Sequence, residues 1–167
     1  MATWSGIRNK LEKEYLAESL KGRVTYFATS YSYAPDHVGR AAIRVDGEEV
    51  LKSDYFKKHL VQWECYQELE RNEEYSRIDT WMKAWDEAVN RGGFDNHSFY
   101  NAFDEFDNQS IEASLESQNV LVRIFAVLDR RVGKRRLKKL SEMWENEPQC
   151  LRYFLNLRME AERIPMV

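Results

Sequence analysis

Glycine, proline and cysteine are scarce in this chain, and long apolar runs are absent. Its 167 residues include 7 Gly, 3 Pro and 2 Cys. So little glycine and proline excludes collagen-like and low-complexity chains. No apolar stretch approaches the roughly 20 residues that a membrane-spanning helix needs. The first residues carry charges where a signal peptide has an apolar stretch. Cys65 and Cys150 lie far apart and form no disulfide framework, so we expect a cytoplasmic protein.

Apolar and aromatic residues are plentiful enough to fill a core. Hydrophobic residues make up 43% of the chain, and the aromatic residues are 8 Phe, 9 Tyr and 5 Trp. This composition is typical of a globular protein and excludes a disordered one. The length indicates one domain spanning 1–167, with a soft sub-boundary near residue 53.

The small net charge of −3 hides a segregation along the chain. Residues 61–90 carry 3 basic and 8 acidic side chains, and residues 92–122 carry 6 acidic and no Lys or Arg. Residues 123–167 carry 11 basic and 6 acidic side chains. An acidic middle followed by a basic end can mark a partner surface, or the two parts can face each other within the fold.

The pattern of apolar residues predicts an α+β fold. A helix over 5–20 is followed by alternating, β-prone residues at 24–29, 41–45 and 49–51. Asp46-Gly47 is typical of a type I′ turn, so we expect a three-stranded antiparallel meander with the helix on one face.

From residue 54 onward the apolar spacing predicts a helical majority of about five to six helices. Their apolar stripes fall near 56–67, 74–90, 96–107, 119–132, 137–144 and 148–163. An α-solenoid arrangement of the helices in 119–163 stays open. The aromatic stripe of Trp63, Trp81, Trp85 and Phe103 is interpreted as core.

The densest cluster of charged residues is basic: seven of the ten residues in 130–139 are Lys or Arg. Such a cluster can bind the phosphate groups of a nucleic acid. Two observations argue against a nucleic-acid-binding protein: the chain as a whole is slightly acidic, and the cluster contains no aromatic residue on which a base could stack. The alternative is a basic helix face paired with the acidic middle. The partner-binding candidates are Arg130, Arg131, Lys134, Arg135, Arg136 and Lys138, with Asp104, Glu105 and Asp107 on the acidic side.

Motifs for catalysis, metal binding or nucleotide binding are missing. There is no HExxH, CxxC, GxSxG, GxGxxG or GxxxxGK[ST], so we predict no catalytic residue, metal or cofactor. His59 and Cys65 fall on different sides of one helix and cannot act together within it. For an enzyme with an unrecognised site, the pocket candidates are Tyr26, His37, Arg40 and Arg44.

Two stretches of the chain carry a recognisable pattern. One runs from Trp4-Ser5 through Ser19-Leu20-Lys21-Gly22-Arg23-Val24 to Gly39-Arg40 and Val45-Asp46-Gly47, and the other is Leu128-Asp129-Arg130-Arg131-Val132-Gly133-Lys134-Arg135. Together they resemble a family of small uncharacterised bacterial cytosolic proteins. The resemblance implies a bacterial, cytosolic origin and one domain, and it brings no activity or ligand. It also implies that the basic segment has a role beyond solubility.

We therefore expect a non-enzymatic binding protein that recognises a protein partner through charged faces. An immunity or regulatory role is one version, in which the acidic middle captures a basic partner by electrostatic steering. The alternatives are a nucleic-acid-binding protein that uses 130–139 and an enzyme with an unrecognised site. The oligomeric state stays open.

Overall fold

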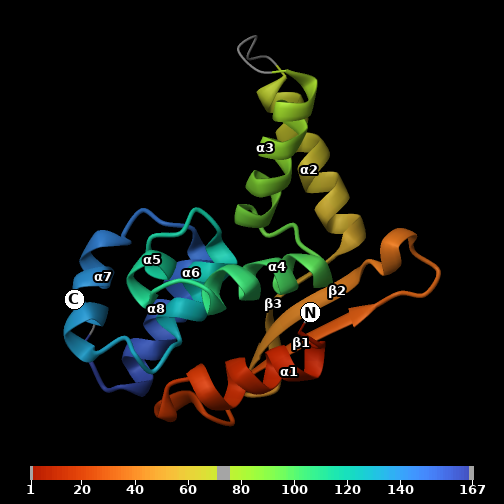
Figure 1. The fold of residues 1–167 in the computed structure, drawn as a ribbon. Coiled ribbons are helices and arrows are strands. Elements are labelled where there is room, and N and C mark those ends of the chain that lie inside the picture. The colour runs from red at the N-terminus through yellow and green to blue at the C-terminus, as the bar shows by residue number, and fades with distance from the viewer. Residues whose placement is uncertain (1, 71–75, 166–167) are drawn as a thin grey trace.

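The computed structural model describes residues 2–70 and 76–165, which contain three strands and eight α-helices (Figure 1). The strands are β1 Val24–Ser30, β2 Gly39–Val45 and β3 Glu48–Asp54. The helices are α1 Trp4–Asn9, α2 Tyr55–Leu69, α3 Arg77–Asn90, α4 Asn96–Asp107, α5 Ile111–Leu115, α6 Val120–Val127, α7 Lys134–Met143 and α8 Gln149–Ala161. The α+β fold is confirmed.

The three strands form the antiparallel meander that the sequence predicts, in the order β1-β2-β3. Asp46 and Gly47 have φ angles of 52° and 86°, as both central positions of a type I′ turn require. β2 and β3 are longer than expected, because their pairing runs on to Arg40 and Asp54. The end of β3 leads directly into α2, where the Asp54 side chain accepts a hydrogen bond from the Lys57 N–H and caps the helix.

The expectation of one continuous helix over 5–20 is wrong. α1 is capped by Thr3 and ends at Asn9, a π-helical stretch continues over Lys10–Tyr15, and the chain then becomes extended. The reason lies far along the sequence: the Ala17 N–H donates to the Leu128 carbonyl, and the Arg130 N–H donates to the Tyr15 carbonyl. These tertiary hydrogen bonds satisfy backbone groups that a continuing helix would have paired internally.

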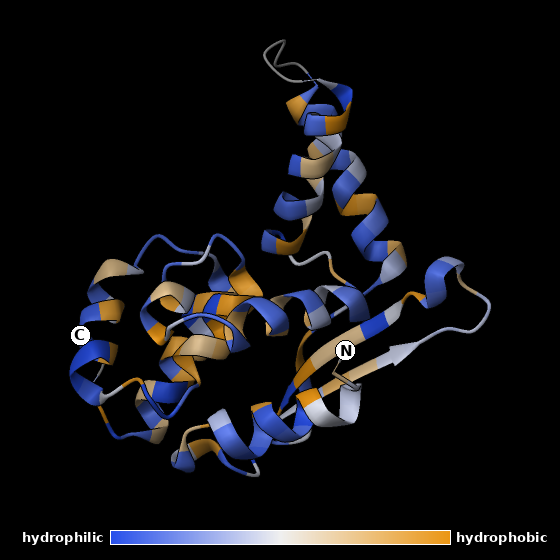
Figure 2. Ribbon diagram, viewed as in Figure 1, coloured by the Kyte–Doolittle hydropathy of each residue, from blue (hydrophilic) through white to orange (hydrophobic). Residues whose placement is uncertain are grey.

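α6 lies at the centre of the molecule. Seven of its eight residues are buried, and Figure 2 shows it as a concentration of hydrophobic residues. A helix that is apolar on all sides needs cover on all sides, which excludes a solenoid of stacked pairs. Phe125 of α6 meets Tyr26 of β1 at a centroid distance of 5.6 Å and both Phe99 and Phe106 of α4 at 5.9 Å. One hydrophobic core cluster therefore contains residues from before and from after residue 53.

The number and ends of the helices differ from the prediction. From residue 54 onward, seven α-helices (α2 to α8) occur in the described ranges rather than five to six, because short segments such as α5 were not separated by their apolar pattern. The helix predicted over 119–132 ends at Val127. The predicted start at residue 74 lies outside the described residues, and α3 begins after its cap, Ser76.

Candidate functional site

α2 and α3 form a helical hairpin that projects from the rest of the molecule (Figure 1). The two helices meet along a seam that lacks large apolar side chains. The seam consists of Lys58, Gln62 and Cys65 from α2 and Thr80, Ala84 and Ala88 from α3, all at most 3% exposed. Because small and polar residues fill the seam, the large apolar residues of both helices are left to face outward.

Six large apolar side chains of the hairpin are exposed, at the spacing i, i+4, i+7 on each helix. They are Phe56 (58% exposed), Leu60 (66%), Trp63 (50%), Ile78 (76%), Met82 (60%) and Trp85 (39%). At roughly 200 Å² for each aromatic side chain, Phe56, Trp63 and Trp85 together expose about 300 Å², and the three aliphatic side chains add to this area. The interpretation of the tryptophan stripe as core is therefore wrong for Trp63 and Trp85 and right for Phe103, which is 3% exposed.

We call these six exposed side chains the apolar face, and an aromatic cluster that includes Trp63 links the two helices beside it. Trp81 of α3 lies 6.4 Å from the ring of His59 and 5.6 Å from that of Tyr66, and Tyr66 stacks on Trp63 at 5.6 Å. Elsewhere the hairpin is polar: the Arg91 guanidinium lies 2.8 Å from Glu68 and 3.1 Å from Glu87. The hairpin is thus amphipathic as a unit, although no core covers its apolar face.

A cavity of about 560 Å³ opens beside the apolar face, at the base of the hairpin. Its walls come from the first turns of α2, from Trp85 and from the loop around Pro35. We call it the basal cavity. Its lining residues are Pro35, Asp36, Val38, Tyr55, Phe56, Lys58, His59, Leu60, Gln62, Trp85 and Asp95.

A buried ion pair lines the basal cavity. Lys58 Nζ lies 3.4 Å from Asp95 Oδ2, and the two side chains are 4% and 3% exposed. The same Nζ lies 3.2 Å from the ring centroid of Trp85. Desolvation lowers the pKa of Lys58, while the charge of Asp95 and the hydrogen bond to it oppose that shift. Asp95 also accepts hydrogen bonds from Ser98 and caps α4, so the ion pair fixes the hairpin to the start of α4.

Gln62 is the other buried polar residue of the cavity lining. Its side chain lies in the seam, 2% exposed, and its Nε2 has no hydrogen-bond partner among residues 2–70 and 76–165. Buried polar groups are nearly always paired, so an unpaired amide donor beside a cavity is unusual.

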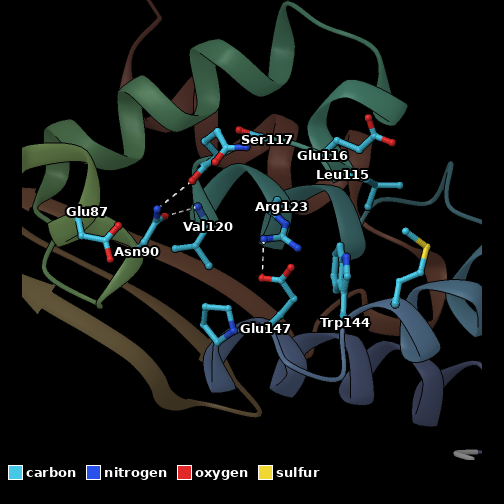
Figure 3. A pocket seen from close by; sticks show the side chains of 12 residues that line it. Glu87, Asn90, Leu115, Glu116, Ser117, Val120, Arg123, Trp144 and Glu147 are labelled. Atoms are coloured by element: carbon cyan, nitrogen blue, oxygen red, sulfur yellow. Dashed lines mark hydrogen bonds and ion pairs between the residues drawn. The ribbon is translucent and has the colours of Figure 1, made fainter. Parts of the chain in front are cut away.

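A second concavity, of about 550 Å³, lies between the end of α3 and the α7–α8 connection (Figure 3). Arg123 Nη1 donates to Glu147 Oε2 at 2.9 Å, which lowers the pKa of Glu147. The same guanidinium lies 4.7 Å from the ring of Trp144. Asn90 donates to the Gln118 carbonyl and accepts from the Val120 N–H. The polar groups of this concavity thus form hydrogen bonds with neighbouring parts of the fold. The exception is the buried Arg123 Nε, which has no hydrogen-bond partner among the described residues.

The basic segment is divided between internal pairs and exposed charges. Arg131 pairs with the buried Asp129 at 2.8 Å and lies 5.2 Å from the Tyr15 ring centroid, and Arg136 pairs with Glu112 of the acidic stretch at 3.1 Å. The remaining cations are exposed and form no ion pair within residues 2–70 and 76–165. They are Arg130, Lys134, Arg135, Lys138 and Lys139.

The three acidic candidates on α4 also have different surroundings. Asp107 lies 3.1 Å from Lys10 Nζ and accepts a hydrogen bond from the Tyr15 hydroxyl. Glu105 accepts from Ser117 and Gln109. Asp104 is exposed and accepts from Asn108. Only Asp104 of the three is both exposed and engaged with no more than a neighbouring amide.

The four pocket candidates are not brought together. Tyr26 is buried on the core face of β1, whereas Arg40 and Arg44 lie on the other face of the sheet. There both guanidinium groups pair with Glu49 and lie near the Phe27 ring. His37 is exposed in the loop before β2. No group of three or more His, Cys, Asp or Glu in the described part of the chain is arranged to hold a metal ion.

Sequence reasoning missed Lys58, Gln62 and Asp95, and it assigned Trp63, Trp81 and Trp85 of the hairpin to the core. The apolar spacing in α2 and α3 was visible, but periodicity marks an apolar side without saying what covers it. The available signal was the opposite side of each helix: Lys58, Gln62 and Thr80 occupy positions that an ordinary hairpin would fill with large apolar residues.

The fold and the site define a small α+β protein with a projecting amphipathic hairpin and a cavity at the base of that hairpin. The sequence model of the SF0329 protein family matches residues 3–159, so the chain belongs to this family of uncharacterised proteins. The resemblance to an uncharacterised family is thereby confirmed. No curated protein and no solved structure matches the chain. In the described ranges no helix has the length and apolar character needed to cross a bilayer.

Proposed function

We propose that this protein binds a partner protein through the apolar face of its α2–α3 hairpin. The observation that carries the proposal is that six large apolar side chains of one projecting hairpin are each 39–76% exposed. The largest apolar patch of an ordinary monomer is about 300–600 Å² and is often functional. A stable protein–protein interface covers about 800 Å² on each partner, and the apolar face supplies the apolar centre of such an interface.

Charge selects the kind of partner. Residues 55–90, which include the hairpin, carry 8 acidic and 5 basic side chains, a formal net charge of −3. Negative charge around an apolar centre favours a basic partner and speeds its association. A second copy of this chain would present the same negative charge, so face-to-face pairing of two hairpins is disfavoured. An immunity or regulatory role is compatible with this mode of binding.

The cytosol of a bacterial cell is the proposed setting. Both cysteines are free, and burial raises the pKa of each thiol. Free cysteines persist in a reducing compartment.

Site-specific photo-crosslinking in cells tests the proposal. A photoreactive phenylalanine analogue replaces Met82, which is 60% exposed on the apolar face, or Met143, which is 61% exposed on α7. We expect a crosslink to one basic protein from position 82 and none from position 143. With the purified partner, Met82→Gln should weaken binding about tenfold and Met143→Gln should leave it unchanged.

Three outcomes would contradict the proposal. One is the same set of crosslinked proteins from both positions. Another is a partner whose affinity is unaffected by Met82→Gln and Leu60→Gln together. The third is a homodimer, detected by light scattering, that these two substitutions dissociate.

The exposed cations of the basic segment favour a second candidate function, binding of nucleic acid. Five exposed cations that contact phosphates would give a slope of log affinity against log salt of about −4.5 on duplex DNA. A salt titration with labelled duplex and single-stranded probes measures this slope. The absence of binding near physiological salt would exclude this second function.

A further inference from the structure

The basal cavity shares Phe56, Leu60 and Trp85 with the apolar face, and it also has the features of a small-molecule site. Its volume of about 560 Å³ lies within the range of ligand pockets, about 300–1,000 Å³. Its walls are mainly apolar and include Val38, Phe56, Leu60 and the indole of Trp85. Such pockets commonly use a few polar groups to orient the ligand.

Gln62 is the polar group that indicates a ligand. Its side chain is 2% exposed, it lines the cavity, and its Nε2 lacks a hydrogen-bond partner in the described part of the chain. Neighbouring residues cannot easily replace that partner, because Lys58 is itself a donor and Asp95 is engaged by Lys58 and Ser98. A hydrogen-bond acceptor brought in by a ligand would satisfy this amide.

The charges of the cavity determine what the acceptor can be. Lys58 and Asp95 neutralise each other at 3.4 Å, and the ammonium also contacts the face of Trp85. A ligand carboxylate would place a second negative charge near Asp95, whose side chain is itself buried. A neutral carbonyl oxygen pairs with the amide without that penalty.

We propose that the basal cavity binds a neutral small molecule that combines an apolar body with a carbonyl oxygen, and that Gln62 Nε2 donates a hydrogen bond to this oxygen. Primary and secondary amides, esters and ketones with an aryl or alkyl group have this chemistry.

Three probes of similar shape test the proposal by two-dimensional NMR of the full-length protein. They are phenylacetamide, which is neutral and has a carbonyl group, phenylacetate, which is charged, and ethylbenzene, which has no acceptor. Probes with about ten non-hydrogen atoms bind weakly, so the two soluble probes are titrated to about 20 mM. We expect saturable shifts of the Gln62 side-chain amide and the Trp85 indole N–H with phenylacetamide, and weaker binding of phenylacetate.

Two matched variants separate the hydrogen bond from apolar contact. Gln62→Met keeps the side-chain volume and removes the donor, and Gln67→Met makes the same change at an exposed position of α2. Gln62→Met should weaken phenylacetamide binding about 3- to 10-fold and leave ethylbenzene binding unchanged. Since the substitution removes an unpaired buried donor, it should not impair folding.

The proposal is overturned if phenylacetamide produces no saturable shift at Gln62 and Trp85. It is also overturned if Gln62→Met and Gln67→Met weaken binding equally, or if phenylacetate binds more tightly than phenylacetamide.

Discussion

A single buried guanidinium, that of Arg158 in α8, holds the turn that ends α6. Arg158 Nη1 donates to the carbonyls of Val127 and Asp129 at 3.0 and 2.7 Å, and Nη2 donates to that of Val132 at 2.8 Å. Nε donates to Glu162 at 3.0 Å, and the Arg158 side chain is 4% exposed. We predict that Arg158→Met is among the most destabilising single changes in the protein.

The magnitude follows from the groups that the substitution leaves behind. Hydrogen bonds to a charged group contribute about 1.5–3 kcal/mol each, and three carbonyls lose their charged donor together. The gain from no longer burying a charge offsets part of this loss; that burial is what lowers the pKa of Arg158. We expect a loss of about 3–5 kcal/mol in the free energy of unfolding, as for other broken buried pairs. For a chain of this size, the loss corresponds to a fall in Tm of about 6–20 °C.

Urea denaturation followed by circular dichroism measures this loss, with Arg152→Met as the control. Arg152 is exposed on the same helix and donates to a single carbonyl, that of Glu147, at 2.9 Å. Its replacement should change the unfolding free energy by less than about 0.5 kcal/mol. If Arg158→Met costs less than about 1 kcal/mol, or no more than Arg152→Met, the assigned role of this guanidinium is wrong.

Three further predictions concern other parts of the fold. Burial, the hydrogen bond to Asp107 and the charge of Asp107 raise the pKa of Tyr15 to about 12. Asp107→Asn should therefore lower the midpoint of the Tyr15 titration, which ultraviolet absorbance measures. Desolvation raises the pKa of Asp107, but the hydrogen bonds from Tyr15 and Lys10 outweigh it and hold the value below the ordinary one. The contribution of Asp107 to stability is therefore present above about pH 4 and lost as the pH falls through the lowered pKa, and the Asn variant should show a smaller acid-induced loss in chemical denaturation. Phe125→Ala should cost about 3–5 kcal/mol, because it removes the ring that joins the sheet to α4; a loss below about 2 kcal/mol would contradict this. Gly39→Ala should disrupt the pairing of β1 with β2, seen as lost hydrogen-exchange protection, because the new Cβ would lie 1.9 Å from the Thr29 carbonyl oxygen.

Local chemistry explains which parts of the fold are predictable from the sequence. The meander is predictable because Asp46-Gly47 tolerates positive φ angles and the flanking residues alternate. The N-terminal helix is mispredicted because the backbone of Tyr15 and Ala17 pairs with residues 128–130, and no local pattern encodes such a partner. The end of α6 is mispredicted for the same reason: Leu128 and Val132 continue the apolar spacing, but Arg158 binds the carbonyls of a turn there.

The candidate site was less accessible to sequence reasoning than the fold. Trp63 and Trp85 have the spacing of core residues, and only the structure shows that they are 50% and 39% exposed. Lys58 and Asp95 lie 37 positions apart, so their pairing depends on the fold. The charge segregation was visible in the sequence, but its division into internal pairs such as Arg136–Glu112 and exposed cations was not.

The hydrogen bond between Ser19 and Glu162 has a consequence for the order of folding. It joins residues 143 positions apart, and it secures an N-terminal segment whose backbone already depends on residues 128–130. The body of the protein therefore has long-range contacts that cannot form until α8 has been synthesised. The α2–α3 hairpin closes over a short stretch of chain, so it can form earlier, with its apolar face exposed. During synthesis this surface is accessible before the body is complete, and premature association there is a hazard that the negative charge around it reduces.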